Sequence, residues 1–193
     1  MVGGSTFRCN VLRTRKCPSA VRKLPVSRKP HIPRSDRKIA SDYRPRISGD
    51  EKPDICTYSV ENNQRSIRYW CKWDHDGPNQ VDDWEPMFVE IDRRGRITRI
   101  RTRAHWTWVI WEKPELKDSN VQVDFVSGYH TPIIKSRSFK VTGSPEDQAI
   151  GRATLWLAQN YRALTRPRKY TDVQFQKGGP PPGSEALKGV ESN

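Results

Sequence analysis

Residues 65–91 read RSIRYWCKWDHDGPNQVDDWEPMFVEI, two apolar segments that enclose a short acidic stretch. Aromatic and β-branched residues dominate both flanks, which is the composition of β-strands. Residues 74–85 between them hold five carboxylates and one histidine, and their centre, Asp-Gly-Pro-Asn, is typical of a turn. The sequence therefore predicts two neighbouring strands joined by an acidic loop.

Further strands are expected on both sides of this pair. Residues 55–60 and 65–73 form a predicted hairpin around the polar turn at 61–64. The longest alternation of the chain spans 97–111 and predicts one continuous strand with Trp106 and Trp108 on its core face. The opposite face then carries a basic row, which is either an ordinary solvated face or a surface for an anionic ligand: Arg99, Arg101, Arg103 and His105. Shorter strands are expected at 85–92, 121–126 and 137–141.

One long helix is expected after the strands. In the sequence Gly-Ser-Pro-Glu-Asp at 143–147, Ser144 can cap a helix, Pro145 suits its first position, and the two acids favour its positive end. Apolar residues follow at helical spacing up to Leu164. We expect a helix over 145–164 that lies on the sheet, with Trp156 in the core.

These elements predict a mainly β fold with one C-terminal helix, of the α+β class. The strands form an antiparallel β-sandwich or a strongly curved sheet. We expect one domain at 54–166, which includes the helix. Residues 1–53, rich in Pro, Arg and Ser, are expected to be a disordered basic arm, and residues 167–193 a flexible C-terminal tail.

Charge is concentrated at the N-terminus. The chain has a net charge of +13, and residues 1–50 hold 13 Lys and Arg against three acids. Such an arm predicts binding of nucleic acid or another polyanion through residues 1–50, and a merely solvated leader is the alternative. A membrane span needs about 18 apolar residues in a row, and we expect none here and no secretory signal. Location in the cytoplasm is the prediction, with organelle import less favoured because four prolines interrupt the leader.

The four cysteines contain no CxxC pair and no zinc-module spacing. Cys56 and Cys71 both fall in predicted strands. They are expected to be small buried apolar residues, or alternatively a pair across the hairpin.

The acidic loop offers a physical reason for a divalent cation site. Asp83 and Glu85 are two residues apart, so in a strand they project to one face while Trp84 points to the core as an anchor. Asp74 and Asp76 repeat this pattern beside Trp73. Carboxylates that lie this near to one another repel each other unless a cation, a proton or an arginine relieves the repulsion. The alternative is a solvated turn whose acids pair with neighbouring arginines.

The string DHDGPNQVDDWEPMFVEID resembles the Asp-Trp-Glu signature of necrosis- and ethylene-inducing-like proteins and the related pattern of vacuolar-sorting proteins, over about residues 65–132. The resemblance implies a β-sandwich with a divalent metal in an acidic pocket that contains Asp83 and Glu85. His130 resembles the later histidine ligand of the family, and Asp74 or Asp76 its earlier aspartate. The chain departs from the family motif at Gln80, where the family has a histidine, so membrane-toxin activity is not carried over.

Two hypotheses follow. The first is a divalent-metal-binding β-sandwich with Mg²⁺ or Ca²⁺ favoured over Zn²⁺, acting in anionic-ligand binding or metal-assisted hydrolysis, with enzymatic activity left open. Its candidate ligands are Asp74, Asp76, Asp83, Glu85 and His130, with His75 or His105 behind them and Arg99, Arg101 and Arg103 as anion-binding groups. The second is a nucleic-acid-binding or ribonucleoprotein-associated protein that acts through its basic arm.

Overall fold

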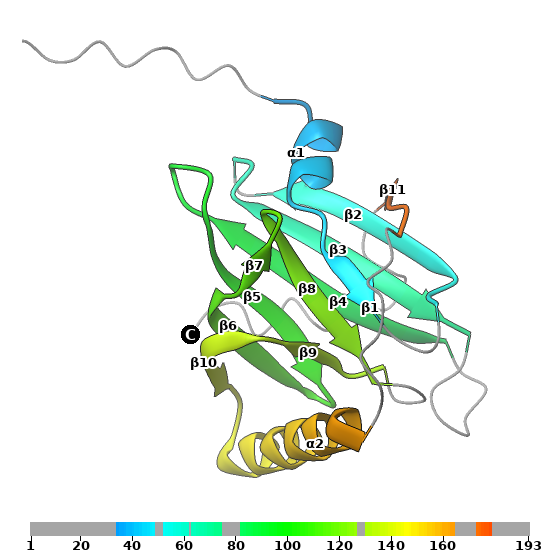
Figure 1. The fold of residues 1–193 in the computed structure, drawn as a ribbon, viewed down its shortest axis with the longest axis vertical. Coiled ribbons are helices and arrows are strands. Elements are labelled where there is room, and N and C mark those ends of the chain that lie inside the picture. Colours follow the sequence, from blue (N-terminus) through cyan, green and yellow to red (C-terminus); the bar gives the residue numbers. More distant parts are fainter. Residues whose placement is uncertain are drawn as a thin grey trace, which may run out of the picture. The chain divides into compact units, whose positions relative to one another are not determined.

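The structure is a computed structural model. It describes residues 34–48, 52–61, 63–74, 82–126, 130–164 and 173–178, without the side chains of 161–164. Two β-sheets dominate these residues, and their elements are drawn in Figure 1.

The larger sheet has seven strands, which are antiparallel except for the last pair. A terminal strand, β11, adds in parallel to the edge of β2. In spatial order the strands are β10 (Ser136–Val141), β6 (Thr107–Pro114), β5 (Ile97–Ala104), β4 (Asp83–Ile91), β3 (Ser66–Trp73), β2 (Ile55–Glu61) and β11 (Gln176–Lys177).

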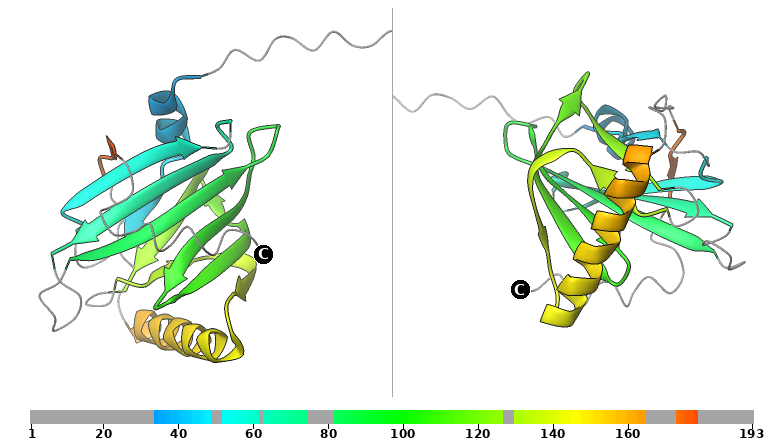
Figure 2. Two further views of the ribbon diagram at one scale, coloured as in Figure 1. Left: turned by 180° about the vertical axis from the view of Figure 1, so that it is seen from behind. Right: turned by 60° about the horizontal axis from the view of Figure 1, so that its bottom comes forward.

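The second sheet has four short strands that lie against one face of the larger sheet, as the views in Figures 1 and 2 show. It is built around β8 (Asn120–Phe125), with β1 (Arg46–Ser48) parallel to it and β7 (Leu116–Lys117) and β9 (Pro132–Ile134) antiparallel. Side chains from both sheets share one core, where the rings of Trp73 and Phe125 lie 4.7 Å apart. The prediction of a mainly β fold with sandwiched sheets is confirmed.

The prediction of one continuous strand over 97–111 is wrong. The chain turns at His105 and Trp106, so β5 and β6 form a hairpin in which Arg103 pairs with Trp108. His105 adopts a left-handed φ of 59°, which histidine tolerates better than most residues. The turn shifts the alternation by one residue, so that Val109 and Trp111 enter the core while Trp108 faces outward and Trp106 is exposed.

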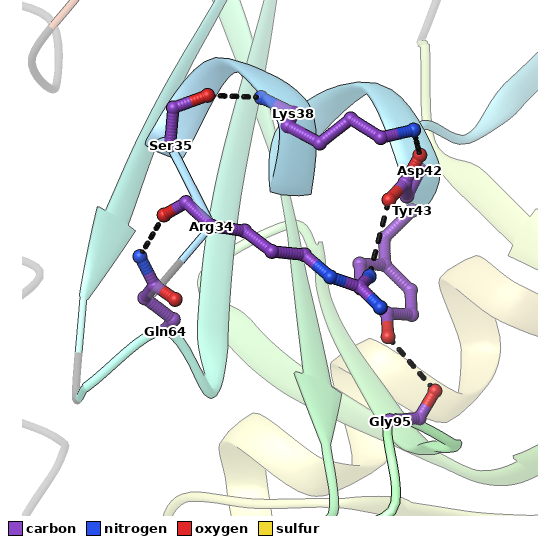
Figure 3. A network of polar contacts seen from close by, with 7 residues as sticks. All are labelled: Arg34, Ser35, Lys38, Asp42, Tyr43, Gln64 and Gly95. Carbon is purple, nitrogen blue, oxygen red and sulfur yellow. Dashed lines mark hydrogen bonds and ion pairs between the residues drawn. The ribbon is translucent and has the colours of Figure 1, made fainter. Parts of the chain in front are cut away.

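Residues 34–48 are described and belong to the folded part, although they lie inside the stretch predicted as a disordered arm. Helix α1 (Asp36–Asp42) is capped by Ser35, and its buried Ile39 and Ala40 join the core. Figure 3 shows how its ends are held to two strand turns. The Gln64 side chain donates to the Arg34 carbonyl oxygen, and Tyr43 donates to the carbonyl oxygen of Gly95. The prediction of an arm is therefore wrong for residues 34–48, while residues 1–33 lie outside the described part of the chain.

Helix α2 (Pro145–Leu164) has the predicted bounds, and the Ser144 hydroxyl accepts from the Asp147 N–H as its cap. It packs closely, because a Cβ placed on Gly151 would meet Thr107 Oγ1 at 2.3 Å. Over residues 145–160, whose side chains are described, the buried positions of this helix are Gly151, Leu155 and Ala158. The prediction of Trp156 as a core residue is wrong, since it is 63% exposed.

Cys56 and Cys71 are direct partners across the β2–β3 hairpin and form a disulfide. The predicted hairpin is confirmed, and of the two alternatives for these cysteines the pair is the one found. Closing a loop of this length, with a sequence separation of 15 residues, contributes about 3 kcal/mol by restricting the unfolded chain. Within the part of the chain that is described, every helix is too short or too polar to cross a membrane.

Candidate functional site

Asp83 and His130 meet at the end of the sandwich where β4 begins. The His130 Nδ1 atom lies 2.8 Å from Asp83 Oδ2, although the two residues are 47 positions apart in sequence. The His130 side chain is 1% exposed and that of Asp83 17%. Solvent therefore reaches this pair from the carboxylate side.

His130 is held in a constrained position. Its ring stacks on Trp73 at a centroid distance of 4.4 Å and an angle of 10° between the planes. Its backbone N–H donates to the Val126 carbonyl oxygen at 2.7 Å, and its φ is 45°. A left-handed conformation outside glycine costs on the order of 1 kcal/mol and persists only where surrounding contacts enforce it. Packing and backbone together fix this imidazole against Asp83.

Glu85 lies on the same face of β4 as Asp83. The register pairs Asp83 with Trp73 and Glu85 with Cys71, and both partners belong to the buried core. Glu85 itself is 9% exposed. The sequence correctly places the two carboxylates on one face, but this face points into the sandwich rather than away from it.

Trp84 does not point to the core between the sheets, so its predicted role as a peg there is wrong. It pairs with Lys72 on the opposite face of β4 and packs against a second cluster of aromatic residues. Trp73 anchors the acidic end, whereas the sequence analysis placed it beside Asp74 and Asp76. The signal for it was available, because Trp73 ends the strand that pairs directly with Asp83.

Asp74 is placed apart from this pair. Its carboxylate contacts the Lys72 Nζ at 2.9 Å, and Asp82 contacts the same ammonium group at 3.0 Å. These hydrogen bonds raise the pKa of Lys72, with that to Asp74 contributing most. Lys72 lies on the Trp84 face of the sheet, so this charge cluster is a surface arrangement like the solvated alternative.

Three other candidates are not placed at Asp83 by the described contacts. His105 lies in the exposed β5–β6 turn, where its ring stacks on Trp106. His75 and Asp76 belong to residues 75–81, which lie outside the described residues. Among the residues that are described, no three His, Cys, Asp or Glu side chains come together as a group that could hold a metal ion.

The predicted arginine row lies on one face of β5, and two of its arginines form ion pairs with an acid. Arg99 and Arg101 both contact the Glu90 carboxylate, and Arg101 also lies over the rings of Phe88 and Trp108. Arg103 is on the same face, opposite Trp108. Two of the three arginines thus have a neighbouring acid, which lowers their attraction for a free anion.

The outer face also carries residues that sequence reasoning did not find. We call Trp70, Phe88, Trp108 and the partly buried Trp84 the outer aromatic cluster. Its rings lie 5.5 Å apart for Trp70 and Phe88 and 5.0 Å apart for Phe88 and Trp108. A 15-residue strand exceeds the usual 3–10 residues, so length was the signal for the hairpin that places Trp108 here.

A buried polar pair in the second sheet was also missed. The Ser48 hydroxyl donates to the Asp124 carboxylate across the β1–β8 ladder. No pattern marked Ser48, because β1 is only three residues long and follows a proline-rich stretch.

Comparisons with known proteins give a likeness of fold. No protein-family model matches the sequence, and no curated protein matches it. Among solved structures, a chain described as "NLPPya in complex with glucosamine" matches with a TM-score of 0.45 and 16% sequence identity, over 69% of this chain and 84% of that chain. The likeness is weak and concerns the β-sandwich alone. No residue role follows from it.

Proposed function

We propose that this β-sandwich binds a divalent cation at the end of β4, with Asp83 and His130 as its first two ligands. The observation that carries the proposal is the contact between Asp83 and His130. An octahedral ion with bonds of about 2.1 Å keeps adjacent ligand atoms about 3.0 Å apart. The observed 2.8 Å between Asp83 Oδ2 and His130 Nδ1 is close to that separation, so both atoms fit one ion without movement of the strands.

Burial and charge support the same site. Glu85 adds a second carboxylate on the same face of β4, and nearly complete burial of His130 weakens solvent screening. A cation would relieve the repulsion between the two carboxylates. Residues 75–81 join the end of β3 to the start of β4, so Asp76 and His75 are the next candidate donors. Oxygen-rich ligation favours Mg²⁺ or Ca²⁺, whereas the imidazole also suits transition metals.

The chemistry that such an ion supplies is polarisation of a bound water molecule or of an anionic oxygen. The chain's own contribution is to hold the ligands, because stacking on Trp73 and the hydrogen bond to Val126 fix His130. Binding of an anionic ligand at the ion, or hydrolysis there, would use this arrangement. We assign no substrate.

Asp83 and its neighbour Asp82 provide a matched experiment. The protein is purified without chelator and its melting temperature is measured with Mg²⁺, Ca²⁺, Mn²⁺ and Zn²⁺. Ligand at 100 times its Kd stabilises the folded state by about 2.7 kcal/mol, so a clear rise in melting temperature is expected with at least one ion. Asp83→Asn should abolish the rise, and Asp82→Asn, which removes a carboxylate that contacts Lys72 on the other face, should retain it. Equal responses of the two variants, or no response of the wild type to any ion, would contradict the proposal.

A second candidate function rests on the N-terminal charge. Residues 1–33 contain eight Lys and Arg and no acid, which favours binding of nucleic acid or another polyanion. Affinity for duplex DNA should then fall by about 0.9 log units per log unit of salt for each phosphate neutralised. Deletion of residues 1–33 should abolish it, while unchanged binding would move the interface to another part of the chain.

A further inference from the structure

The outer face of the large sheet is aromatic around Phe88, and the arginines beside this ring have acidic partners. Phe88 has the guanidinium groups of Arg68 and Arg101 over its ring at 5.0 and 5.5 Å. Each arginine is also paired with an acid, Arg68 with Glu61 and Arg101 with Glu90. A surface of stacked rings with compensated charge suits an uncharged apolar segment better than a polyanion.

Polar atoms on this face are buried without a partner. Within the described part of the chain, the indole N–H of Trp70, which is 2% exposed, has no acceptor, and the hydroxyl of Ser66, which is 3% exposed, has no partner either. The hydroxyls of Thr57 and Ser59, on the adjacent strand, are also buried and unpaired. The register puts Thr57 beside Trp70, so these groups form one polar row next to the outer aromatic cluster. An unpaired buried donor costs on the order of 1–3 kcal/mol, which points to an acceptor in the functional state.

The described chain ends at this row. Strand β11 pairs with β2, and the Gly178 N–H donates to the Tyr58 carbonyl oxygen at 3.0 Å. A Cβ built on Gly178 would lie 3.1 Å from the Thr57 side chain. Cross-strand Cβ atoms are normally about 5 Å apart. The backbone at Gly178 has therefore turned over Thr57, toward the outer face.

We propose that the outer aromatic cluster and the polar row beside it bind an extended proline-rich segment, and that the occupant is residues 179–183 of this chain. These residues read Gly-Pro-Pro-Pro-Gly. Three prolines favour the polyproline II helix, whose backbone carbonyls are free to accept hydrogen bonds. Aromatic-lined surfaces with an indole donor are the usual receptors for such segments.

Length and direction agree with this occupant. Five residues of polyproline II span about 15 Å, and neighbouring strands lie about 4.8 Å apart. Starting above Thr57 on β2, the segment reaches past Trp70 on β3 and Phe88 on β4. This inference concerns the face opposite to Asp83 and His130, and it stands independently of cation binding.

The test uses the full chain and the indole N–H signals of its seven tryptophans in a proton–nitrogen correlation spectrum, assigned with single Trp→Phe variants. The triple variant P180S/P181S/P182S keeps the length but loses the polyproline preference. We expect it to shift the Trp70 and Trp108 signals by more than a linewidth. The signals of Trp73 and Trp111, in the core between the sheets, should stay in place and report that the variant is folded.

A matched control is E185S/K188S/E191S, three substitutions further along the same tail. It should leave the Trp70 and Trp108 signals unchanged, and a peptide of residues 178–193 added to the proline variant should restore the wild-type positions. The proposal is overturned if the proline variant moves neither signal or if both variants move them equally. It is also overturned if the wild-type signals change on dilution, because the occupant would then be a second copy of the chain.

Discussion

The two faces of the seven-stranded sheet are both aromatic, but they are closed in different ways. On the inner face, Trp73 and Trp111 pack under the second sheet, and the Trp111 indole N–H donates to Thr102 Oγ1 at 2.8 Å. On the outer face, Trp70 is equally buried but its indole N–H has no partner. Arginines, rather than a second sheet, lie over Phe88 there. Among the described residues, the buried Trp111 of the inner face therefore has a hydrogen-bond acceptor, whereas the buried Trp70 of the outer face has none.

This difference suggests that the inner face mainly stabilises the fold and that the outer face mainly binds a further segment. A core whose polar groups are satisfied contributes to folding through burial alone. A buried surface with unpaired donors carries a cost that only a ligand or a further segment removes. We therefore expect substitutions on the inner face to act on unfolding, and those on the outer face to act more weakly and more on binding.

The largest effect is expected from removing one tryptophan from each face. Trp73→Ala deletes a fully buried ring that packs on both Phe125 and His130, so we expect a loss of about 3–5 kcal/mol in the free energy of unfolding. Trp84→Ala removes a partly buried ring on the outer face and should cost about 1–2 kcal/mol. Urea unfolding of the two variants measures both values. Equal losses would contradict the distinction between the faces.

A moderate, pH-dependent effect is expected at Tyr69 on the inner face. Burial raises the pKa of Tyr69 well above its usual range, despite the opposing effect of Arg44. The unfolded chain then releases this proton near pH 10 while the folded chain retains it, so the stabilisation is complete below pH 10 and is lost as the pH rises above it. Tyr69 also donates to the Ala40 carbonyl oxygen at 2.8 Å.

Tyr69→Phe should therefore cost about 1 kcal/mol at pH 7, through the lost hydrogen bond. Its free energy of unfolding should fall less steeply than that of the wild type between pH 9 and pH 11. Chemical unfolding at a series of pH values compares the two slopes. Parallel slopes would show that Tyr69 is not the group that titrates.

The smallest effect is expected at Glu90 on the outer face. Glu90→Gln removes the carboxylate that pairs with Arg99 and Arg101, of which Arg99 is half exposed. Exposed ion pairs contribute about 0–1 kcal/mol and are screened by salt. The difference in melting temperature between the variant and the wild type should therefore shrink in about 1 M salt. A loss that persists there would indicate that the carboxylate supports the packing of the arginines on Phe88 and Trp108 instead.

The sequence predicts those parts of the molecule where one local pattern decides the structure. The β2–β3 hairpin follows from β-branched residues around a polar turn, and α2 follows from the cap at Ser144. The β5–β6 hairpin was missed because its turn, at His105 and Trp106, contains no glycine, asparagine or proline. This missed turn affects the whole of β6, since an error of one residue assigns every side chain of the strand to the wrong face of the sheet.

The candidate site was only partly predictable for a similar reason. Alternation places Asp83 and Glu85 on one face of a strand, but it does not state whether this face is inner or outer when both faces are aromatic. Asp74 lies on the face opposite to Asp83, where it forms an ion pair with Lys72, two residues earlier on the same face. His130 meets Asp83 only through the assembly of the sandwich, which a local pattern cannot reveal.

The disulfide between Cys56 and Cys71 forms only where the surroundings are sufficiently oxidising. Its partners lie directly across the hairpin, and Cys71 is the neighbour of Glu85 in the ladder. Thiol-reducing surroundings such as the cytosol keep most cysteine pairs open, whereas oxidising compartments keep them closed. Location in the cytoplasm stays a prediction, and it conflicts with this bond. The glutathione balance where the chain folds would thus decide whether the strand beside the acidic end is cross-linked to its neighbour.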